Sequence, residues 1–333
     1  MLLQVDDLHI QLPSAHGSVA AVRGISLSLE RNQVHCLVGE SGCGKTMTAM
    51  AIIGLLPRGA QRRAAGMHFD GIDLQEMSES RMRALRGRRI AMIFQDPMTA
   101  LNPSFTIETQ LTDVLKHHER VGHAAARDRA VYLLSRVGIR DPLARLRQYP
   151  HELSGGLRQR VMIAMALMCQ PELLLADEPT TALDVTIQME VLSLLAELGS
   201  EYRLGLVLVS HDLGMVSQVA DWISVMYAGE IVESGAAADI IDAPIHPYTQ
   251  GLLRCVPVPG RTRRQTALYT IPGSIDTVDG HPNQCAFVDR CEFAHPGCRT
   301  AAIPMRSYSA SRLFRCNLEP ERLRRTSSDA ASA

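Results

Sequence analysis

A glycine-rich run at residues 39–46 carries the clearest chemistry in the sequence, and it reads Gly-Glu-Ser-Gly-Cys-Gly-Lys-Thr. An apolar run precedes it at 34–38 and another follows at 47–53, so a strand, a glycine turn and a helix are predicted in that order. This is the setting that a phosphate-binding P-loop requires. Backbone amides in such a loop, with the positive end of the following helix, bind the oxygens of a phosphate chain.

The residue types in this loop suit a nucleoside triphosphate. We predict that its glycines adopt φ values closed to other residues, that Lys45 reaches the β and γ phosphates, and that Thr46 offers its hydroxyl to Mg²⁺. Only two of the 34 basic residues are lysines, and a compact ammonium suits a phosphate better than a planar guanidinium. The alternative is a chance glycine turn ahead of a core helix. The predicted phosphate-binding set is Gly39, Ser41, Gly42, Cys43, Gly44, Lys45, Thr46 and Thr48.

Three other apolar runs end in polar side chains. The runs 90–94, 173–176 and 206–209 are followed by Gln95, by Asp177-Glu178 and by Ser210-His211. At a strand end, a first carboxylate can hold Mg²⁺ and a second can polarise an attacking water. Asp177 and Glu178 stand in these two positions. A lone histidine is usually structural, but His211 follows the next strand, where it can contact a γ-phosphate.

The run Leu153-Ser154-Gly155-Gly156 stands ahead of a helix predicted over 161–168. Ser154 is a reasonable N-cap, and two glycines beside it expose amides at a helix start, which is an anion site. Taken alone, the run is equally a capped turn.

Composition limits the class of protein. The 333 residues, 46% hydrophobic and 21% charged, predict a soluble globular protein of one or two domains. The net charge of −1 gives no general attraction for nucleic acid. The sequence holds no apolar run near the roughly 18 residues of a membrane helix, and its first residues do not resemble an export signal. Any membrane association is therefore expected to come through a partner.

The remaining pattern is that of a mixed α/β protein. Alternation at 3–12 and 20–29 predicts two paired strands, and a short strand is predicted around 67–69 with a helix at 76–85. From 107 to about 146 the periodicity is helical, which indicates a helical insertion.

These motifs together resemble the ATP-binding subunits of ABC transporters over about residues 1–250. The resemblance implies a P-loop NTPase fold with a RecA-like core, an antiparallel β subdomain and a helical subdomain at about 98–160, all within a nucleotide-binding domain spanning 1–253. It implies that Glu178 is the general base, that Gln95 and Asp177 serve Mg²⁺ with Thr46, and that His211 senses the γ-phosphate. Lys45 and Gln95 join the catalytic set.

The resemblance also assigns residues that act on a second subunit. Ser154, Gly155 and Gly156 would complete an ATP site held by a neighbour, and Asp184 ends the Ala-Leu-Asp element of the family. Two departures stand out. Leu157 replaces the usual glutamine, and 14–19 lack the aromatic residue that often stacks on adenine, for which His16 is the nearest substitute.

His246-Pro247-Tyr248-Thr249 resembles a signature of the oligopeptide, dipeptide and nickel importers within that family. It implies a subunit that powers peptide import, peripheral at the cytoplasmic face of the inner membrane. Its partners would be two permeases, a second related ATPase and, indirectly, a substrate-binding protein, with no nucleic acid. Nickel chelates, glutathione or another small solute stay open as cargo. A soluble ABC ATPase acting on ribosomes or DNA is the competing class, but those usually carry two cassettes or long coiled-coil arms.

Four of the eight cysteines crowd into the C-terminal stretch, at Cys285, Cys291, Cys298 and Cys316. Their separations of five, six and seventeen residues fit none of the common zinc-finger spacings. In peptide-importer ATPases the pattern resembles the ligand set of a 4Fe-4S cluster. Zinc or unconnected thiols are the alternatives. A metal would fix a segment poor in apolar residues, so we expect a small Cys-rich domain at 254–325, followed by a disordered tail at 326–333.

Overall fold

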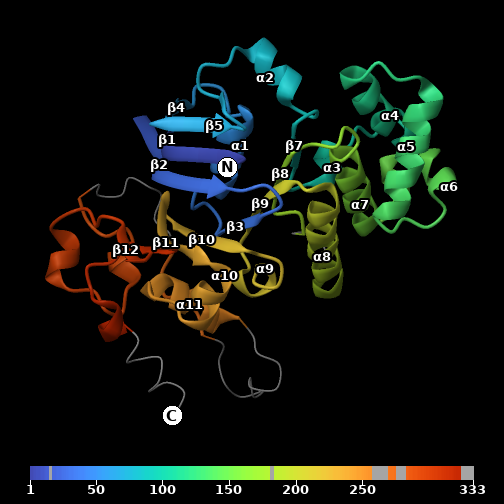
Figure 1. Cartoon of the computed structure of the whole chain (residues 1–333). Coiled ribbons are helices and arrows are strands. Elements are labelled where there is room, and N and C mark those ends of the chain that lie inside the picture. The colour runs from blue at the N-terminus through green and yellow to red at the C-terminus, as the bar shows by residue number, and fades with distance from the viewer. Residues whose placement is uncertain (15–16, 181–183, 257–268, 275–282, 324–333) are drawn as a thin grey trace.

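The computed structural model describes residues 1–14, 17–180, 184–256, 269–274 and 283–323. Its centre is an eight-stranded sheet in the order β12-β13-β11-β10-β3-β9-β8-β7 (Figure 1). Five neighbouring strands of it run parallel, and they are β10 (Trp222–Tyr227), β3 (Val34–Val38), β9 (Gly205–Ser210), β8 (Leu173–Asp177) and β7 (Ile90–Ile93). Because parallel strands present their carboxyl ends at one edge, the polar residues that follow them meet there.

A second, antiparallel sheet lies above the central one in Figure 1. It contains β1 (Leu3–Ser14), β2 (Gly17–Leu29), β4 (Gln61–Arg63), β5 (Gly66–Phe69) and β6 (Ile72–Asp73). Its inner face packs with α1 (Lys45–Ile53) around fully buried side chains such as Leu3, Ile52 and Phe69. The alternation at 3–12 and 20–29 therefore predicted the two long strands correctly, because one face of each is buried.

A helical part projects to the right in Figure 1. It comprises α3 (Pro97–Ala100), α4 (Ile107–His118), α5 (His123–Arg136), α6 (Pro142–Leu146), the 3₁₀ turn η1 (Pro150–Glu152) and α7 (Gly155–Ala166). Its apolar faces join the core that covers the central sheet, together with α8 (Val185–Tyr202) and α9 (Leu213–Val216). α7 starts at Gly155, earlier than the predicted 161, because Ser154 caps the two glycines into the helix. α2 (Glu79–Leu85) starts after its cap Ser78, later than the predicted 76.

The C-terminal part is built onto the central sheet. After β11 (Glu230–Ala236), α10 (Ala237–Asp242) and α11 (Pro247–Cys255), the 3₁₀ turns η2 (Val288–Arg290) and η3 (Pro296–Arg299) lead to the hairpin β12 (Arg306–Ser309) and β13 (Arg312–Phe314). β13 pairs with β11, so the hairpin extends the sheet, and the prediction of a separate Cys-rich domain is not confirmed.

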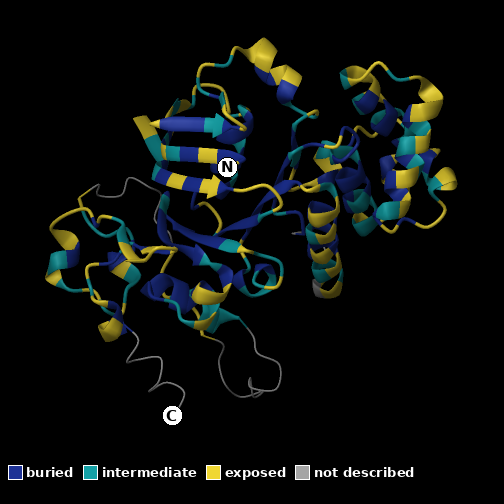
Figure 2. Cartoon of the chain, in the orientation of Figure 1, coloured by how far each residue is buried: buried dark blue, intermediate teal, exposed yellow. Residues whose placement is uncertain are grey.

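The join is fixed by a buried ion pair. Arg312 donates to Glu233 at 2.7 Å, and both side chains are almost fully buried. Figure 2 shows the central strands buried and the surrounding C-terminal loops more exposed. Over the described residues, the model contains no helix with the length and apolarity needed to cross a membrane.

Candidate active site

The glycine-rich loop joins β3 to α1 as predicted. Gly42 and Gly44 have φ values of 82° and 106°, in the left-handed region that favours glycine. The prediction was wrong for Gly39, whose φ is not positive. Gly39 is needed for space instead, because a Cβ there would lie 2.1 Å from the Met226 carbonyl oxygen. The loop is therefore shaped by two backbone turns and one close approach to β10.

Lys45 lies at the centre of the loop and is only 4% exposed. Its Nζ donates to the carbonyl oxygens of Gly39 at 2.8 Å and Glu40 at 2.9 Å, and it lies 3.9 Å from Glu178 Oε1. The ammonium is thus held by the loop it serves, so the loop sets where this positive charge lies.

Thr46 and Asp177 meet at the predicted magnesium position. The Thr46 hydroxyl donates to Asp177 Oδ1 at 3.0 Å. Burial raises the pKa of Asp177 above its ordinary value, against the opposing effect of the Thr46 hydrogen bond. A hydroxyl and a carboxylate are hard oxygen donors that suit Mg²⁺, which takes one or two carboxylates together with substrate phosphates. These two residues fit that ion, although the described residues hold no group of three or more His, Cys, Asp or Glu that could bind a metal alone.

Glu178 is the residue on which the other catalytic candidates converge. Its Oε2 accepts a hydrogen bond from Gln95 Nε2 at 3.0 Å and lies 3.4 Å from His211 Nδ1. The hydrogen bond to Glu178 raises the pKa of His211, which favours the cationic imidazolium beside the carboxylate. Glu178 also has a φ of 43°, uncommon for a residue with a side chain, and its amide donates to the Val209 carbonyl at 3.0 Å. The strand ends thus bring Gln95, Glu178 and His211 together.

A cleft of about 320 Å³ opens over the loop. Its lining residues are Leu12, Val19, Ala21, Ser41, Gly42, Gly44, Lys45, Thr46, Met47, Gln95 and Glu178. The apolar wall was missed in the sequence, although Leu12 and Val19 are direct cross-strand partners and Ala21 follows on the same face of β2. His16 lies outside the described residues, so its predicted contact with a base stays a prediction.

Several predicted residues do not line the cleft. Cys43 is fully buried, and the buried Thr48 hydroxyl donates to the Gly44 carbonyl at 3.1 Å. Both side chains therefore pack on the protein side of the loop and stabilise its conformation. Ser154 is an exposed N-cap that accepts a hydrogen bond from the Leu157 amide at 3.4 Å. The signature Ser154, Gly155 and Gly156 and the exposed Asp184 are all absent from the lining, and 181–183 lie outside the described residues.

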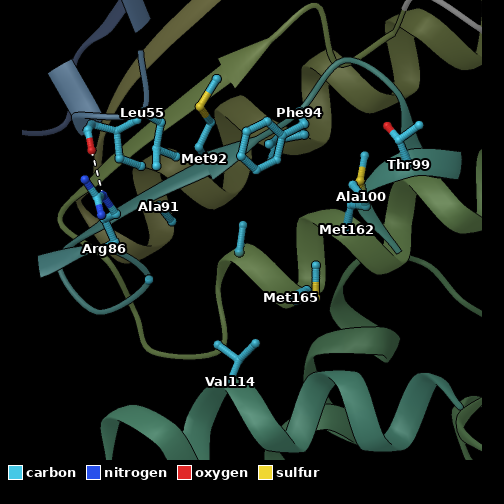
Figure 3. Close-up of a pocket in the computed structure, with 14 residues that line it drawn as sticks. Leu55, Arg86, Ala91, Met92, Phe94, Thr99, Ala100, Val114, Met162 and Met165 are labelled. Atoms are coloured by element: carbon cyan, nitrogen blue, oxygen red, sulfur yellow. Dashed lines mark hydrogen bonds between the residues drawn. The ribbon is translucent and has the colours of Figure 1, made fainter. Parts of the chain in front are cut away.

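A second cavity of about 530 Å³ lies beside β7, α3, α4 and α7, and was not predicted (Figure 3). Its wall is mostly apolar, and Phe94, next to Gln95, is 37% exposed. We call it the apolar groove, and its lining is Ile53, Leu55, Arg86, Gly87, Ala91, Met92, Ile93, Phe94, Thr99, Ala100, Val114, Met162, Met165 and Ala166. Exposed apolar surface of this kind marks interaction sites.

The four C-terminal cysteines lie near one another as free thiols. Burial raises the pKa of Cys285 to about 12 and that of Cys291 to about 11, and the charges of neighbouring cysteines add to both effects. The Cys316 sulfur accepts a hydrogen bond from the Leu318 backbone N–H at 3.4 Å, and the Cys285 amide donates to the Cys298 carbonyl at 2.8 Å. This set is called the four-cysteine site below.

Comparison with known proteins decides the family. Residues 22–181 match the ABC transporter family, and residues 232–298 match the family described as the oligopeptide/dipeptide transporter, C-terminal region. The dipeptide transport ATP-binding protein DppD of Escherichia coli (strain K12) is 44% identical, over 95% of this chain and 96% of its own length. The chain belongs to the ATP-binding proteins of ABC transporters, in the oligopeptide/dipeptide branch. The resemblance predicted from the motifs is thereby confirmed.

This ABC ATP-binding protein has other relatives of the same branch. The oligopeptide transport ATP-binding protein OppD of Bacillus subtilis (strain 168) is 46% identical, over 88% of this chain and 82% of its own length.

The dimeric structure of MJ0796, a bacterial ABC transporter cassette, matches with a TM-score of 0.64 and 24% identity, over 71% of this chain and 99% of that chain. That likeness confirms the predicted ABC ATPase fold.

Proposed function

We propose that this protein is the ATP-binding and ATP-hydrolysing subunit that powers import of dipeptides or oligopeptides through an ABC transporter. The observation that carries the proposal is the position of Glu178 beside the cleft, within reach of Lys45, Gln95 and His211. The matched C-terminal region and the dipeptide and oligopeptide relatives support the cargo class.

The loop and the strand ends divide the work. Loop amides and Lys45 bind the phosphate chain and neutralise the charge that develops during transfer. Thr46 and Asp177 would hold Mg²⁺, which supplies further positive charge to the β and γ oxygens when bound. The apolar wall of Leu12, Val19 and Ala21 receives the base and ribose. Its aliphatic side chains predict weak selectivity among bases.

Hydrolysis needs an aligned water. Glu178 accepts a proton from that water while the water oxygen attacks the γ-phosphorus. The bond from the γ-phosphorus to the oxygen of the β-phosphate breaks, giving ADP and phosphate. Gln95 and His211 orient the carboxylate from two sides. His211 in its cationic form also stabilises negative charge on the γ-phosphate.

Replacing Glu178 by glutamine tests this role. The E178Q variant keeps its size and the contact with Gln95 but cannot take the proton, so hydrolysis should fall by about a hundredfold or more. ATP affinity, measured by equilibrium binding with Mg²⁺, should stay within about threefold. If the wild-type chain does not bind ATP, the proposed function itself is wrong. If E178Q hydrolyses ATP at the wild-type rate, only the assignment of Glu178 as the general base is wrong.

The signature is proposed to act on a neighbouring subunit. Ser154 is exposed at the start of the twelve-residue helix α7 and lies outside the cleft of its own chain. A helix N-terminus with free amides suits the γ-phosphate of ATP bound by a second, related ATPase subunit. We propose that two such sites form between paired subunits and that their closure drives the transporter.

The apolar groove supports a permease contact. Phe94 lines the groove and Gln95 follows it in the chain, so a permease segment bound in the groove would contact the residue next to one that faces the γ-phosphate site. Such a permease contact would hold this protein at the cytoplasmic face of the inner membrane, as the dipeptide and oligopeptide transport relatives suggest.

The four-cysteine site is proposed to hold a 4Fe-4S cluster through Cys285, Cys291, Cys298 and Cys316. Four thiolates are the number of ligands that such a cluster takes, and four cysteine thiols stand in this part of the chain. The Cys285 amide donates to the Cys298 carbonyl at 2.8 Å, which brings two of the cysteine loops together, and the Leu318 amide donates to the Cys316 sulfur at 3.4 Å. The type and number of donors therefore fit such a cluster. When bound, the cluster supplies cross-links between loops and a redox-active centre.

Anaerobic purification tests this assignment. The protein should be brown, absorb near 400 nm as iron–sulfur proteins do, and contain about four irons per chain. The Cys298→Ser variant should lose this absorbance, while Cys255→Ser, a cysteine outside the site, should keep it. A colourless wild-type chain free of iron would exclude the cluster.

A further inference from the structure

One residue of the phosphate-binding loop, Glu40, is held by the C-terminal part of the chain. Its amide donates to the Tyr248 hydroxyl at 2.9 Å, and its carboxylate accepts two hydrogen bonds from Arg290, at 2.8 and 3.0 Å. Its carbonyl oxygen accepts from Lys45 Nζ at 2.9 Å. Every polar group of Glu40 therefore has a partner, and the same residue touches the catalytic lysine.

The Arg290 side chain is itself rigidly placed. It is only 7% exposed, and its Nε donates to the Pro272 carbonyl at 2.7 Å. Its guanidinium lies over the Tyr227 ring, 5.6 Å from the centroid. A two-pronged guanidinium–carboxylate contact fixes orientation as well as distance, so Glu40 is clamped by a group that cannot easily move.

Both partners of Glu40 are connected to residues 285–291, the segment between two cysteines of the four-cysteine site. Arg290 is part of this segment, and Tyr248 of α11 packs against it. Arg290 immediately precedes Cys291, and its amide donates to the Phe287 carbonyl at 3.1 Å. Phe287 lies two residues after Cys285, and its ring packs 5.3 Å from Tyr248. The segment from Cys285 to Cys291 therefore reaches Glu40 by two routes, through Arg290 and through Phe287 and Tyr248.

The segment packs against the core through Phe287, with Cys285 and Cys291 partly buried beside it. Phe287 and Val288 are the buried hydrophobic residues between the two cysteines, and the Cys285 amide donates to the Cys298 carbonyl at 2.8 Å. A group that joined the sulfurs would add to the order of 285–291 by tying this segment to Cys298 and Cys316.

We propose that Arg290 and Tyr248 are positioning residues of the nucleotide site, which transmit the state of the four-cysteine site to the phosphate-binding loop through Glu40. The inference rests on the proposed ATP site and extends it. Two effects act in the same direction. Without the clamp the loop must be ordered when nucleotide binds, and without Arg290 a carboxylate stays uncompensated beside a triphosphate.

Equilibrium binding of MgATP to the full-length chain on the E178Q background tests the clamp without turnover. Arg290→Met removes the charge and keeps most of the length, and we expect the dissociation constant to rise about tenfold, less at high salt. Tyr248→Phe removes only the hydroxyl and should raise it severalfold, because the Glu40 amide loses its partner.

Arg299→Met is the matched control. Arg299 is another arginine of the same part, paired with Asp289 at 2.6 Å, but its side chain is 53% exposed and reaches no loop residue. It should bind MgATP like the parent. If Arg290→Met and Tyr248→Phe both stay within twofold of the parent, the positioning role is wrong while the ATP site stands. If no chain binds nucleotide, the proposed function fails first.

The link to the cysteines has its own test. Cys285→Ser should raise the dissociation constant in the E178Q parent but add little in its Arg290→Met/Tyr248→Phe double variant, because both routes are already broken there. Equal factors in both chains, including no change in either, would exclude the link.

A reciprocal measurement covers the case in which Cys285→Ser does not fold. By linkage, MgATP should slow the labelling of Cys285 by a thiol reagent in the chain freed of iron by a chelator, with the labelling followed by mass spectrometry. The protection should be several-fold in the E178Q parent and absent in its Arg290→Met/Tyr248→Phe derivative. Equal labelling with and without MgATP in the parent would overturn the link.

Discussion

His35 lies in a buried hydrogen-bonded chain that defines its protonation. Its Nδ1 lies 3.0 Å from the Ser28 carbonyl, which can only accept, so Nδ1 carries the proton. Nε2 then accepts from the Ser224 hydroxyl at 2.8 Å. Ser224 receives from Ser234 in turn, and Trp222 donates to Ser234 at 2.8 Å. A second proton on His35 would reverse this chain and leave a hydroxyl hydrogen without an acceptor.

Acid should therefore destabilise the protein well above the carboxylate range. Burial lowers the pKa of His35 to about 4 and that of His246 to about 3, whereas an unfolded histidine titrates near 6.5. Both states are neutral above that value, so these groups give no pH dependence there. Below it the unfolded chain binds protons that the folded chain refuses. Each histidine then lowers the unfolding free energy by up to about 1.4 kcal/mol per pH unit.

Urea unfolding at pH 7, 6 and 5 measures this slope. His35→Asn keeps a donor for the Ser28 carbonyl but removes the imidazole from the buried chain, so it should be less stable at pH 7. Because asparagine cannot titrate, the change of unfolding free energy with pH should correspond to about one proton fewer taken up on unfolding. His123→Asn, at a side chain 61% exposed, should keep the wild-type slope. An unchanged slope in His35→Asn would mean that His35 does not contribute.

At the scale of elements, local pattern predicted most of what surrounds the ATP site. The strand, loop and helix at 34–53 follow from one apolar run, three glycines and a second apolar run, and the polar residues at strand ends meet because the strands are parallel. Gln95, Glu178 and His211 are far apart in sequence, yet their convergence was predictable from that rule together with the family resemblance.

Contacts between distant elements were not predictable. Nothing local to Glu40 indicates Arg290, 250 residues away, as its partner. The pairing of β13 with β11 also carries no local signal, since a three-residue strand such as Arg312–Phe314 is specified by the buried Arg312–Glu233 pair. The requirement at Gly39 was misassigned for the same reason, because a distant carbonyl, and not backbone torsion, excludes a side chain there.

On the scale of the whole molecule, the two surfaces proposed to communicate with the ATP site lie at opposite edges of one sheet. β7, which lines the apolar groove, is the last strand at one edge, and the C-terminal hairpin forms the other (Figure 1). Among the strands of this sheet, β9, β8 and β7 lead to His211, Glu178 and Gln95, the residues proposed to act in hydrolysis. A permease in the groove and the four-cysteine site can therefore both act on the bound nucleotide without touching each other.

A charge in the groove should separate these two connections. Phe94→Glu places a carboxylate on an exposed apolar wall, which tolerates it in the free chain but costs the desolvation of an unpaired charge when an apolar partner docks. We expect the permeases to copurify at least tenfold less, while MgATP affinity and the absorbance near 400 nm stay unchanged. Leu143→Glu, at a side chain 50% exposed on α6 outside the groove, is the control and should copurify normally. Normal copurification of Phe94→Glu would show that the groove is not the docking site. Because the substitution leaves the other edge of the sheet intact, an altered MgATP affinity would show that the two edges do not act independently.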